Sequence, residues 1–157
     1  MSPATPLPVD AAQRWLSFRL AGQRYAAPLA QVSEVIREGE LTPVPGAAGD
    51  LLGIRHLRGR IVPVMDGRLR LGLPPLEEGG HGAVRLVMLS HEQHLIGLRV
   101  DAIGELLDVA PEAIAPPPPD RASRSDDPVR GVFAVPGGFV ALLDVPRLCR
   151  VPEASRA

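Results

Sequence analysis

The sequence predicts an all-β fold made of two small barrels, and three observations carry this prediction. The same unit occurs twice, because Arg14–Leu73 can be laid over Arg85–Val151. Short runs rich in strand-forming residues follow one another closely, with tight turns between them. Helical periodicity is confined to brief segments. Each repeat has only ~60–70 residues, near the lower limit for an independent core, so we expect the two halves to share buried surface.

The repeat also separates architecture from function. The aligned positions include two apolar stretches, two glycines and an aspartate: Trp15–Phe18 with Leu86–Leu89, Val32–Ile36 with Ile103–Leu107, Gly53 with Gly131, Gly59 with Gly137, and Asp66 with Asp144. Features present in both copies are interpreted as architecture. Features present in one copy only are the better functional candidates.

Copy one is expected to open with a β-hairpin, formed by Trp15–Leu20 and Arg24–Leu29 around a short turn. From Ala30 onward the apolar residues Val32, Val35 and Ile36 lie at helical spacing, which predicts a short helix.

A second hairpin is predicted from Leu51–Leu57 and Arg60–Met65. In copy two the corresponding turn is Pro136-Gly137, a sequence typical of a type II turn. The alignment then puts Arg58 and Gly59 at the two central turn positions of copy one, which would hold Arg58 at an exposed hairpin tip.

Asp66 and Asp144 each end a predicted strand before a short leucine-containing segment. Such a residue is suited to cap a helix N-terminus. Because both copies carry the aspartate, we interpret it as structural rather than catalytic.

The predicted organisation has five parts. Residues 1–13 form a mobile Pro- and Ala-rich start, 14–73 the first subdomain, 74–82 a linker, 83–150 the second subdomain and 151–157 a tail. A proline-rich loop at 116–128 interrupts copy two and is expected to be stiff, with a solvated charged part.

Composition argues against several classes of protein. The formal net charge of −1 and the scarcity of aromatic residues argue against nucleic-acid binding. The single cysteine, Cys149, excludes an intrachain disulfide and a zinc site of several thiolates, and is expected to be a small buried hydrophobe. No apolar run approaches the ~20 residues that span a bilayer, and the N-terminus lacks a secretion signal, so we expect a cytoplasmic protein without membrane insertion.

Catalytic patterns are also missing from the sequence. The four histidines are His56, His81, His91 and His94, and the last two flank a predicted turn rather than sharing a helix face. The acidic pairs Glu77-Glu78 and Asp126-Asp127 lie in loops and are expected to be solvated. We therefore expect no enzyme, no cofactor and no metal site.

One difference between the copies is chemical. Copy one carries Arg55-His56-Leu57-Arg58-Gly59-Arg60, whereas the equivalent stretch of copy two, Phe133–Gly138, is neutral. These arginines form either a solvated turn or a docking point for carboxylates and backbone carbonyls of a partner, which suits the planar donor array of arginine.

At this hairpin the chain resembles a known family. The run Leu52–Asp66 is similar to the signature of CheW-like domains, and the resemblance continues at Tyr25–Leu29, Val32–Ile36, Thr42–Gly46, Gly97–Asp101 and Arg130–Val132. It implies two SH3-like five-stranded β-barrels with short helices around a shared hydrophobic core. It also implies a non-catalytic adaptor that joins the cytoplasmic tip of a methyl-accepting chemoreceptor to a CheA-type histidine kinase, whose regulatory domain has the same fold and pairs with it in rings.

The resemblance also suggests interface residues. Val32, Glu34, Gly53 and Arg58 match positions tied to receptor coupling in the family, and Arg55, His56 and Arg60 join them from the basic hairpin. The repeat leaves a structural alternative for three of them, because Val32, Gly53 and Glu34 have the counterparts Ile103, Gly131 and Glu105.

Some residues depart from the family pattern. His56 stands where the family has asparagine, and Gly67 follows Asp66, which is expected to weaken the next helix by ~1 kcal/mol relative to alanine. A scaffold of a paralogous pathway, for twitching motility or second-messenger control, therefore stays open, as does a small-molecule-binding barrel.

Overall fold

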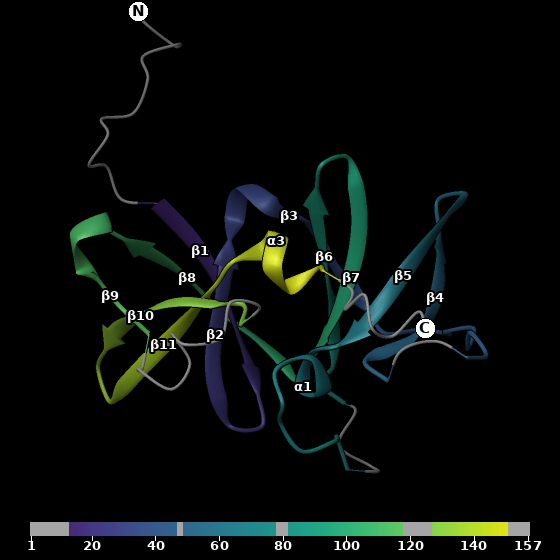
Figure 1. The fold of residues 1–157 in the computed structure, drawn as a ribbon, viewed down its shortest axis with the longest axis horizontal. Helices are drawn as coiled ribbons and strands as arrows, with labels where there is room; N and C mark the ends of the chain where they lie inside the picture. The colour runs from purple at the N-terminus through teal and green to yellow at the C-terminus, as the bar shows by residue number, and fades with distance from the viewer. Residues whose placement is uncertain (1–12, 47–48, 78–81, 118–126, 151–157) are drawn as a thin grey trace, which may run out of the picture.

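The computed structural model describes residues 13–46, 49–77, 82–117 and 127–150, and its strands form two sheets (Figure 1). The strands are, in chain order, β1 (Gln13–Leu20), β2 (Gln23–Pro28), β3 (Val32–Arg37), β4 (Leu51–Leu57), β5 (Arg60–Asp66), β6 (Arg85–His91), β7 (His94–Val100), β8 (Ala102–Val109), β9 (Ile114–Ala115), β10 (Val129–Val135) and β11 (Gly138–Leu143). The short helices are α1 (Gly67–Arg70) and α3 (Val145–Leu148), with 3₁₀ turns η1 (Leu29–Gln31) and η2 (Pro111–Ala113).

Each sheet takes strands from both repeats. Sheet A has the order β8-β1-β2-β11-β10-β9, and sheet B the order β3-β6-β7-β5-β4. The first hairpin of each copy has thus joined the remaining strands of the other, through the short parallel pairs β2–β11 and β5–β7. The predicted boundaries 14–73 and 83–150 separate the sequence repeats, but they do not separate the sheets.

The mostly β fold with two SH3-like units is confirmed, with one difference in strand number. The two-residue strand β9 adds a sixth strand to sheet A, where it pairs with β10. Among the described residues, the equivalent place in sheet B holds an isolated bridge between Thr42 and Ile54.

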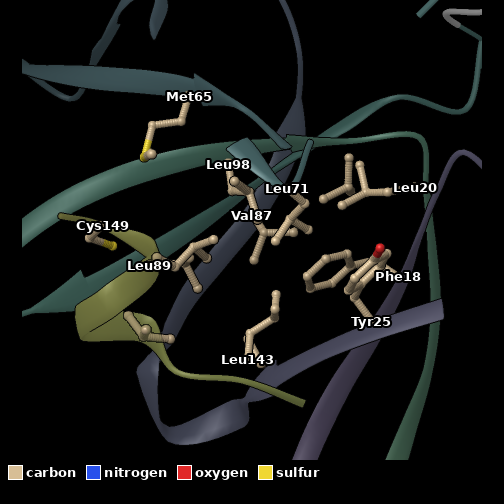
Figure 2. Close-up of a cluster of buried hydrophobic side chains, with 14 of the residues drawn as sticks. Phe18, Leu20, Tyr25, Met65, Leu71, Val87, Leu89, Leu98, Leu143 and Cys149 are labelled. Atoms are coloured by element: carbon tan, nitrogen blue, oxygen red, sulfur yellow. The ribbon is translucent and has the colours of Figure 1, made fainter. Parts of the chain in front are cut away.

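The buried side chains form one cluster shared by the sheets and one further cluster in each sheet. Along β1, Leu16, Phe18 and Leu20 belong to the shared cluster, whereas Trp15 belongs to the cluster of sheet A. Figure 2 shows part of the shared cluster, with side chains from both sheets: Phe18, Leu20, Tyr25 and Leu143 of sheet A, and Met65, Val87, Leu89 and Leu98 of sheet B. Both faces of the central strands are covered, which explains their nearly continuous burial.

The helix predicted after Ala30 is wrong. Only the single turn η1 is helical, and Val32–Arg37 is strand β3, which pairs with β6 at Val35↔Val87 and Ile36↔Leu86. Valine and isoleucine lose rotamer freedom in a helix and pack well on a pleated sheet, so cross-strand pairing outweighed the short apolar periodicity.

The second hairpin is present as predicted, but its turn type in copy one is not. Arg58 and Gly59 both have positive φ, +51° and +79°, which is the pattern of a type I′ turn. In copy two only Gly137 has positive φ, +85°, because Pro136 is fixed at negative φ. The alignment therefore predicted the position of Arg58 but not its backbone conformation.

The two capping aspartates are confirmed. Asp66 accepts hydrogen bonds from the Arg68 and Leu69 N–H groups at the start of α1, and Asp144 accepts one from Arg147 N–H at the start of α3. Cys149 follows α3 and is buried, and burial raises the pKa of its thiol to about 11. A thiol held neutral in this way packs as a hydrophobe.

Gly67 has a role that helix propensity did not indicate. A Cβ at this position would lie 2.5 Å from the Arg99 carbonyl oxygen and 3.0 Å from Leu20 Cδ2. The first residue of α1 is therefore packed against the backbone of β7, and a larger residue does not fit without a shift.

Other predictions concern metal sites and membrane-spanning segments, neither of which the sequence indicates. His91 and His94 flank the β6–β7 turn, as expected. Within the described ranges no three His, Cys, Asp or Glu residues form a candidate metal group, and no helix is long and apolar enough to cross a membrane. His81, Glu78 and Asp126 lie outside the described residues.

Candidate partner interface at the β4–β5 hairpin

The tip of the β4–β5 hairpin is tied to strand β3 by an ion pair. Arg58 Nη2 lies 2.9 Å from Glu34 Oε1, and Arg58 Nη1 donates to Glu34 Oε2, so the pair is bidentate. Strands β3 and β4 are the two edges of sheet B. The Arg58–Glu34 pair therefore joins one edge of the sheet to the turn beside the other, and we call this junction the seam.

The seam pair is exposed and charged. The Arg58 side chain is 71% exposed and that of Glu34 is 23% exposed. Hydrogen bonds from Arg58 hold the pKa of Glu34 below its usual value, and the same bonds raise the pKa of Arg58. Glu34 takes two of the five N–H donors of Arg58, and no other described residue bonds to its guanidinium, so the remaining donors can meet acceptors on a partner.

Arg55 lies on β4, where its guanidinium binds backbone carbonyls at the end of β3 and does not reach the hairpin tip. Its Nη1 donates to the Arg37 carbonyl oxygen at 3.0 Å and also to the Glu38 carbonyl oxygen. Gly39 makes room for it, because a Cβ at Gly39 would lie 2.3 Å from Arg55 Nη1. The guanidinium of Arg55 thus satisfies backbone acceptors at the end of β3, and its first role is structural.

A second arginine joins the end of β5 to the residue that follows β3. Arg99 of β7 donates to Asp66 Oδ2 at 2.9 Å and to Glu38 Oε2 at 3.0 Å. The other carboxylate oxygen of Asp66 caps α1. The sequence analysis missed this role of Arg99, although the repeat offers a signal: at the offset of the first hairpins its counterpart is Pro28.

The remaining predicted interface residues lie in different environments. His56 and Arg60 are exposed on the hairpin, and His56 lines an open hollow of about 390 Å³ with Glu40, Thr42 and Arg55. Val32 is half-buried and packs against the shared core.

Gly53 is buried beneath the backbone that crosses it. A Cβ there would lie 2.5 Å from the Thr42 carbonyl oxygen, and a Cβ at Gly131 would lie 2.8 Å from the Ala115 carbonyl oxygen. Both copies need glycine for the same close approach, which supports the structural alternative for Gly53.

The structure also reveals exposed apolar residues that the sequence analysis did not single out. Among the described residues, Val35 and Leu106 are 37% and 49% exposed, and Ile61 and Phe139 are 63% and 66% exposed. Val35 and Leu106 occupy equivalent positions in β3 and β8, and Ile61 and Phe139 in β5 and β11. Alignment of the two copies pairs these positions, but only the structure shows that their side chains are exposed.

Comparison with known proteins identifies the family. The family model of the CheW-like domain matches residues 14–153. The chain belongs to the CheW-like family. It is 28% identical to the chemotaxis protein CheW of Rhizobium meliloti (strain 1021) over 130 residues, which cover 83% of each chain. It is 33% identical to protein PilI of Pseudomonas aeruginosa over 102 residues, or 62% of this chain and 55% of PilI.

A solved structure shows the same architecture. The crystal structure of the scaffolding protein TtCheW from Thermoanaerobacter tengcongensis superposes with a TM-score of 0.79 and 26% sequence identity, covering 89% of this chain and 94% of TtCheW. CheW-like proteins are non-catalytic scaffolds, and this chain is accordingly a CheW-like adaptor of chemosensory signalling.

Proposed function

We propose that this adaptor couples the cytoplasmic tip of a methyl-accepting chemoreceptor to the regulatory domain of a CheA-type histidine kinase. It would act in the cytoplasm, at membrane-bound receptor arrays, with no ligand or cofactor of its own. The observation that carries the proposal is an asymmetry: both sheets present similar exposed apolar residues, but among the described residues only sheet B carries the charged seam. A scaffold with two similar faces and one distinct face suits partners of more than one kind.

The paired apolar residues support contacts with a partner of similar fold. Ile61 and Phe139 follow the hairpin tips of the two sheets and are largely exposed. Large apolar side chains in exposed positions are typical of protein–protein contacts. Because they recur at equivalent places, each sheet offers the kinase regulatory domain a comparable surface.

The seam supports the receptor contact. Arg58 is exposed, is oriented by Glu34, and has donors left for carboxylates or carbonyls of a helical receptor tip. Arg55 and His56 lie on β4 and Arg60 lies on β5, so they extend the basic surface on both sides of the turn that holds Arg58. Val32 and Gly53 would act indirectly, by positioning β3 and β4.

The proposal is tested by co-precipitation of the full chain with kinase and receptor fragments. Arg58→Glu is expected to lower receptor capture at least about tenfold, because it places a carboxylate beside Glu34, while the Tm changes little at this exposed site. Phe139→Ser serves as the matched variant on sheet A and should lower kinase capture instead. Capture of neither partner by the unaltered chain would refute the adaptor function. If Arg58→Glu unfolds the protein and has no specific effect on receptor binding, the role of Arg58 is refuted.

A scaffold of a paralogous chemosensory pathway is the second candidate. The similarity to PilI and to protein FrzA of Myxococcus xanthus, which is 28% identical over 113 residues, favours it. Co-precipitation with the kinases of each chemosensory system in the source organism distinguishes the two candidates, because a dedicated scaffold captures one kinase preferentially.

A further inference from the structure

A groove opens in sheet A, away from the seam. Strands β2 and β11 pair in parallel over only two positions, Tyr25↔Ala141 and Ala26↔Leu142. Between the β1–β2 hairpin and the β10–β11 hairpin, near the first residues of both strands, lies a hollow of about 500 Å³. Its lining includes Arg19 and Arg24 on one side and Gly137, Gly138 and Phe139 on the other.

The lining of this groove is positively charged. Arg19 and Arg24 are direct cross-strand partners, an arrangement that destabilises a hairpin because like charges face each other. None of the described residues that line the groove is acidic. Within the described parts of the chain, neither guanidinium group takes part in a hydrogen bond or an ion pair.

The other repeat shows that the fold does not require these features. The counterparts of Arg19 and Arg24 in the β6–β7 hairpin are Ser90 and Leu95, and the counterpart of Gly138 is Arg60. At these positions sheet B therefore has the uncharged Ser90 and Leu95 in place of two arginines, and an arginine side chain in place of a glycine. The charged groove belongs to sheet A, as the seam belongs to sheet B.

We propose that this groove binds an acidic segment of a partner protein. Two carboxylates of the segment would pair with Arg19 and Arg24, which removes the repulsion between them, and an apolar side chain would pack on Phe139, which is 66% exposed. This site is separate from the Arg58–Glu34 seam, and it shares Phe139 with the apolar surface proposed for the kinase. Its failure would leave the proposed receptor coupling untouched, and the reverse also holds.

The experiment is a titration of the isotope-labelled full chain, followed by the shifts of its backbone amides. The probe is a short peptide with a central leucine flanked by glutamates, and its counterpart has glutamines in their place. The acidic peptide should shift the amides of Arg19, Arg24, Gly137, Gly138 and Phe139. Its affinity should exceed that of the glutamine peptide about tenfold and should fall as salt rises from about 50 to about 500 mM, because screening weakens exposed ion pairs.

Variants assign the effect to the two arginines. Arg19→Gln combined with Arg24→Gln should weaken binding of the acidic peptide about tenfold. Arg60→Gln, which removes one positive charge at the equivalent end of sheet B, should leave the affinity unchanged. Equal affinity for the two peptides, no shifts, or shifts confined to the β4–β5 hairpin would overturn the proposal. If the double variant does not fold, the salt dependence and the peptide comparison on the unaltered chain decide.

Discussion

At the residue scale, Gly67 shows how packing can reverse a propensity. Alanine is about 1 kcal/mol better than glycine inside a helix, which by itself predicts that Gly67→Ala stabilises α1. The structure places the missing Cβ 2.5 Å from the Arg99 carbonyl oxygen, and Arg99 also holds Asp66 and Glu38. A methyl group at this position therefore displaces the Arg99 backbone and disturbs the contacts of Arg99 with Asp66 and Glu38.

We expect Gly67→Ala to destabilise the protein by about 1–3 kcal/mol, the usual cost of overpacking a well-packed site. Urea unfolding measures the change. Gly138→Ala is the matched control, because no atom lies within 4 Å of a Cβ there and it should leave stability nearly unchanged. A stabilised Gly67→Ala variant would show that propensity, not packing, dominates at this position.

At the scale of elements, the repeat assigns Gly53 and Gly131 to the same structural feature. The register of β4 shifts between Leu51 and Gly53, and that of β10 shifts between Val129 and Gly131. At each shift the backbone of a neighbouring segment passes close to the glycine: Thr42 of the isolated bridge at Gly53, and Ala115 of β9 at Gly131. The close approach is a property of the hairpin rather than of a partner contact.

Gly53→Ala and Gly131→Ala should therefore destabilise by similar amounts, about 2 kcal/mol or more each, since in both copies a backbone carbonyl lies less than 3.0 Å from the added Cβ. Thermal unfolding of the two variants under identical conditions provides the comparison. If Gly53→Ala leaves stability intact and only receptor binding suffers, Gly53 is a contact residue instead.

Prediction from sequence succeeded where signals were local and repeated. The hairpins, the capping aspartates and the burial of Cys149 each depend on a few neighbouring residues. The strand β3 was missed because its stability comes from pairing with β6, which lies about fifty residues away in sequence and leaves no local trace. The Arg58–Glu34 pair was not predicted either. The segment of β3 was expected to be a helix, and the exchange of hairpins that builds sheet B from both copies was not expected.

At the scale of the whole molecule, the reciprocal exchange of hairpins makes the two sheets interdependent. The shared cluster contains residues of both sheets, and Arg70 of α1 donates to the Leu148 carbonyl oxygen at 2.9 Å at the end of α3. Asp101 accepts hydrogen bonds from Arg68 and from Ala21 N–H, so the turn after β7, helix α1 and the β1–β2 turn are joined. Burial alone would raise the pKa of Asp101, but these bonds outweigh it and lower the pKa.

We therefore expect cooperative unfolding of both sheets. The chain contains one tryptophan, Trp15, which lies in the core of sheet A, so its fluorescence reports on that sheet, whereas far-UV circular dichroism reports on both. The two transitions in urea should coincide. Separate midpoints would show that the sheets are independent units despite their exchanged strands.

The central claim is that the polarity of the seam, and not only its closure, serves receptor coupling. The double variant Glu34→Arg with Arg58→Glu reverses the ion pair while keeping both partners, so it tests this claim directly. Receptor co-precipitation is measured together with the Tm. The account predicts a Tm close to that of the unaltered chain and receptor capture as weak as that of Arg58→Glu alone. Full recovery of receptor capture in the double variant would contradict it, because the pair would then matter only as a structural tie between β3 and the β4–β5 hairpin.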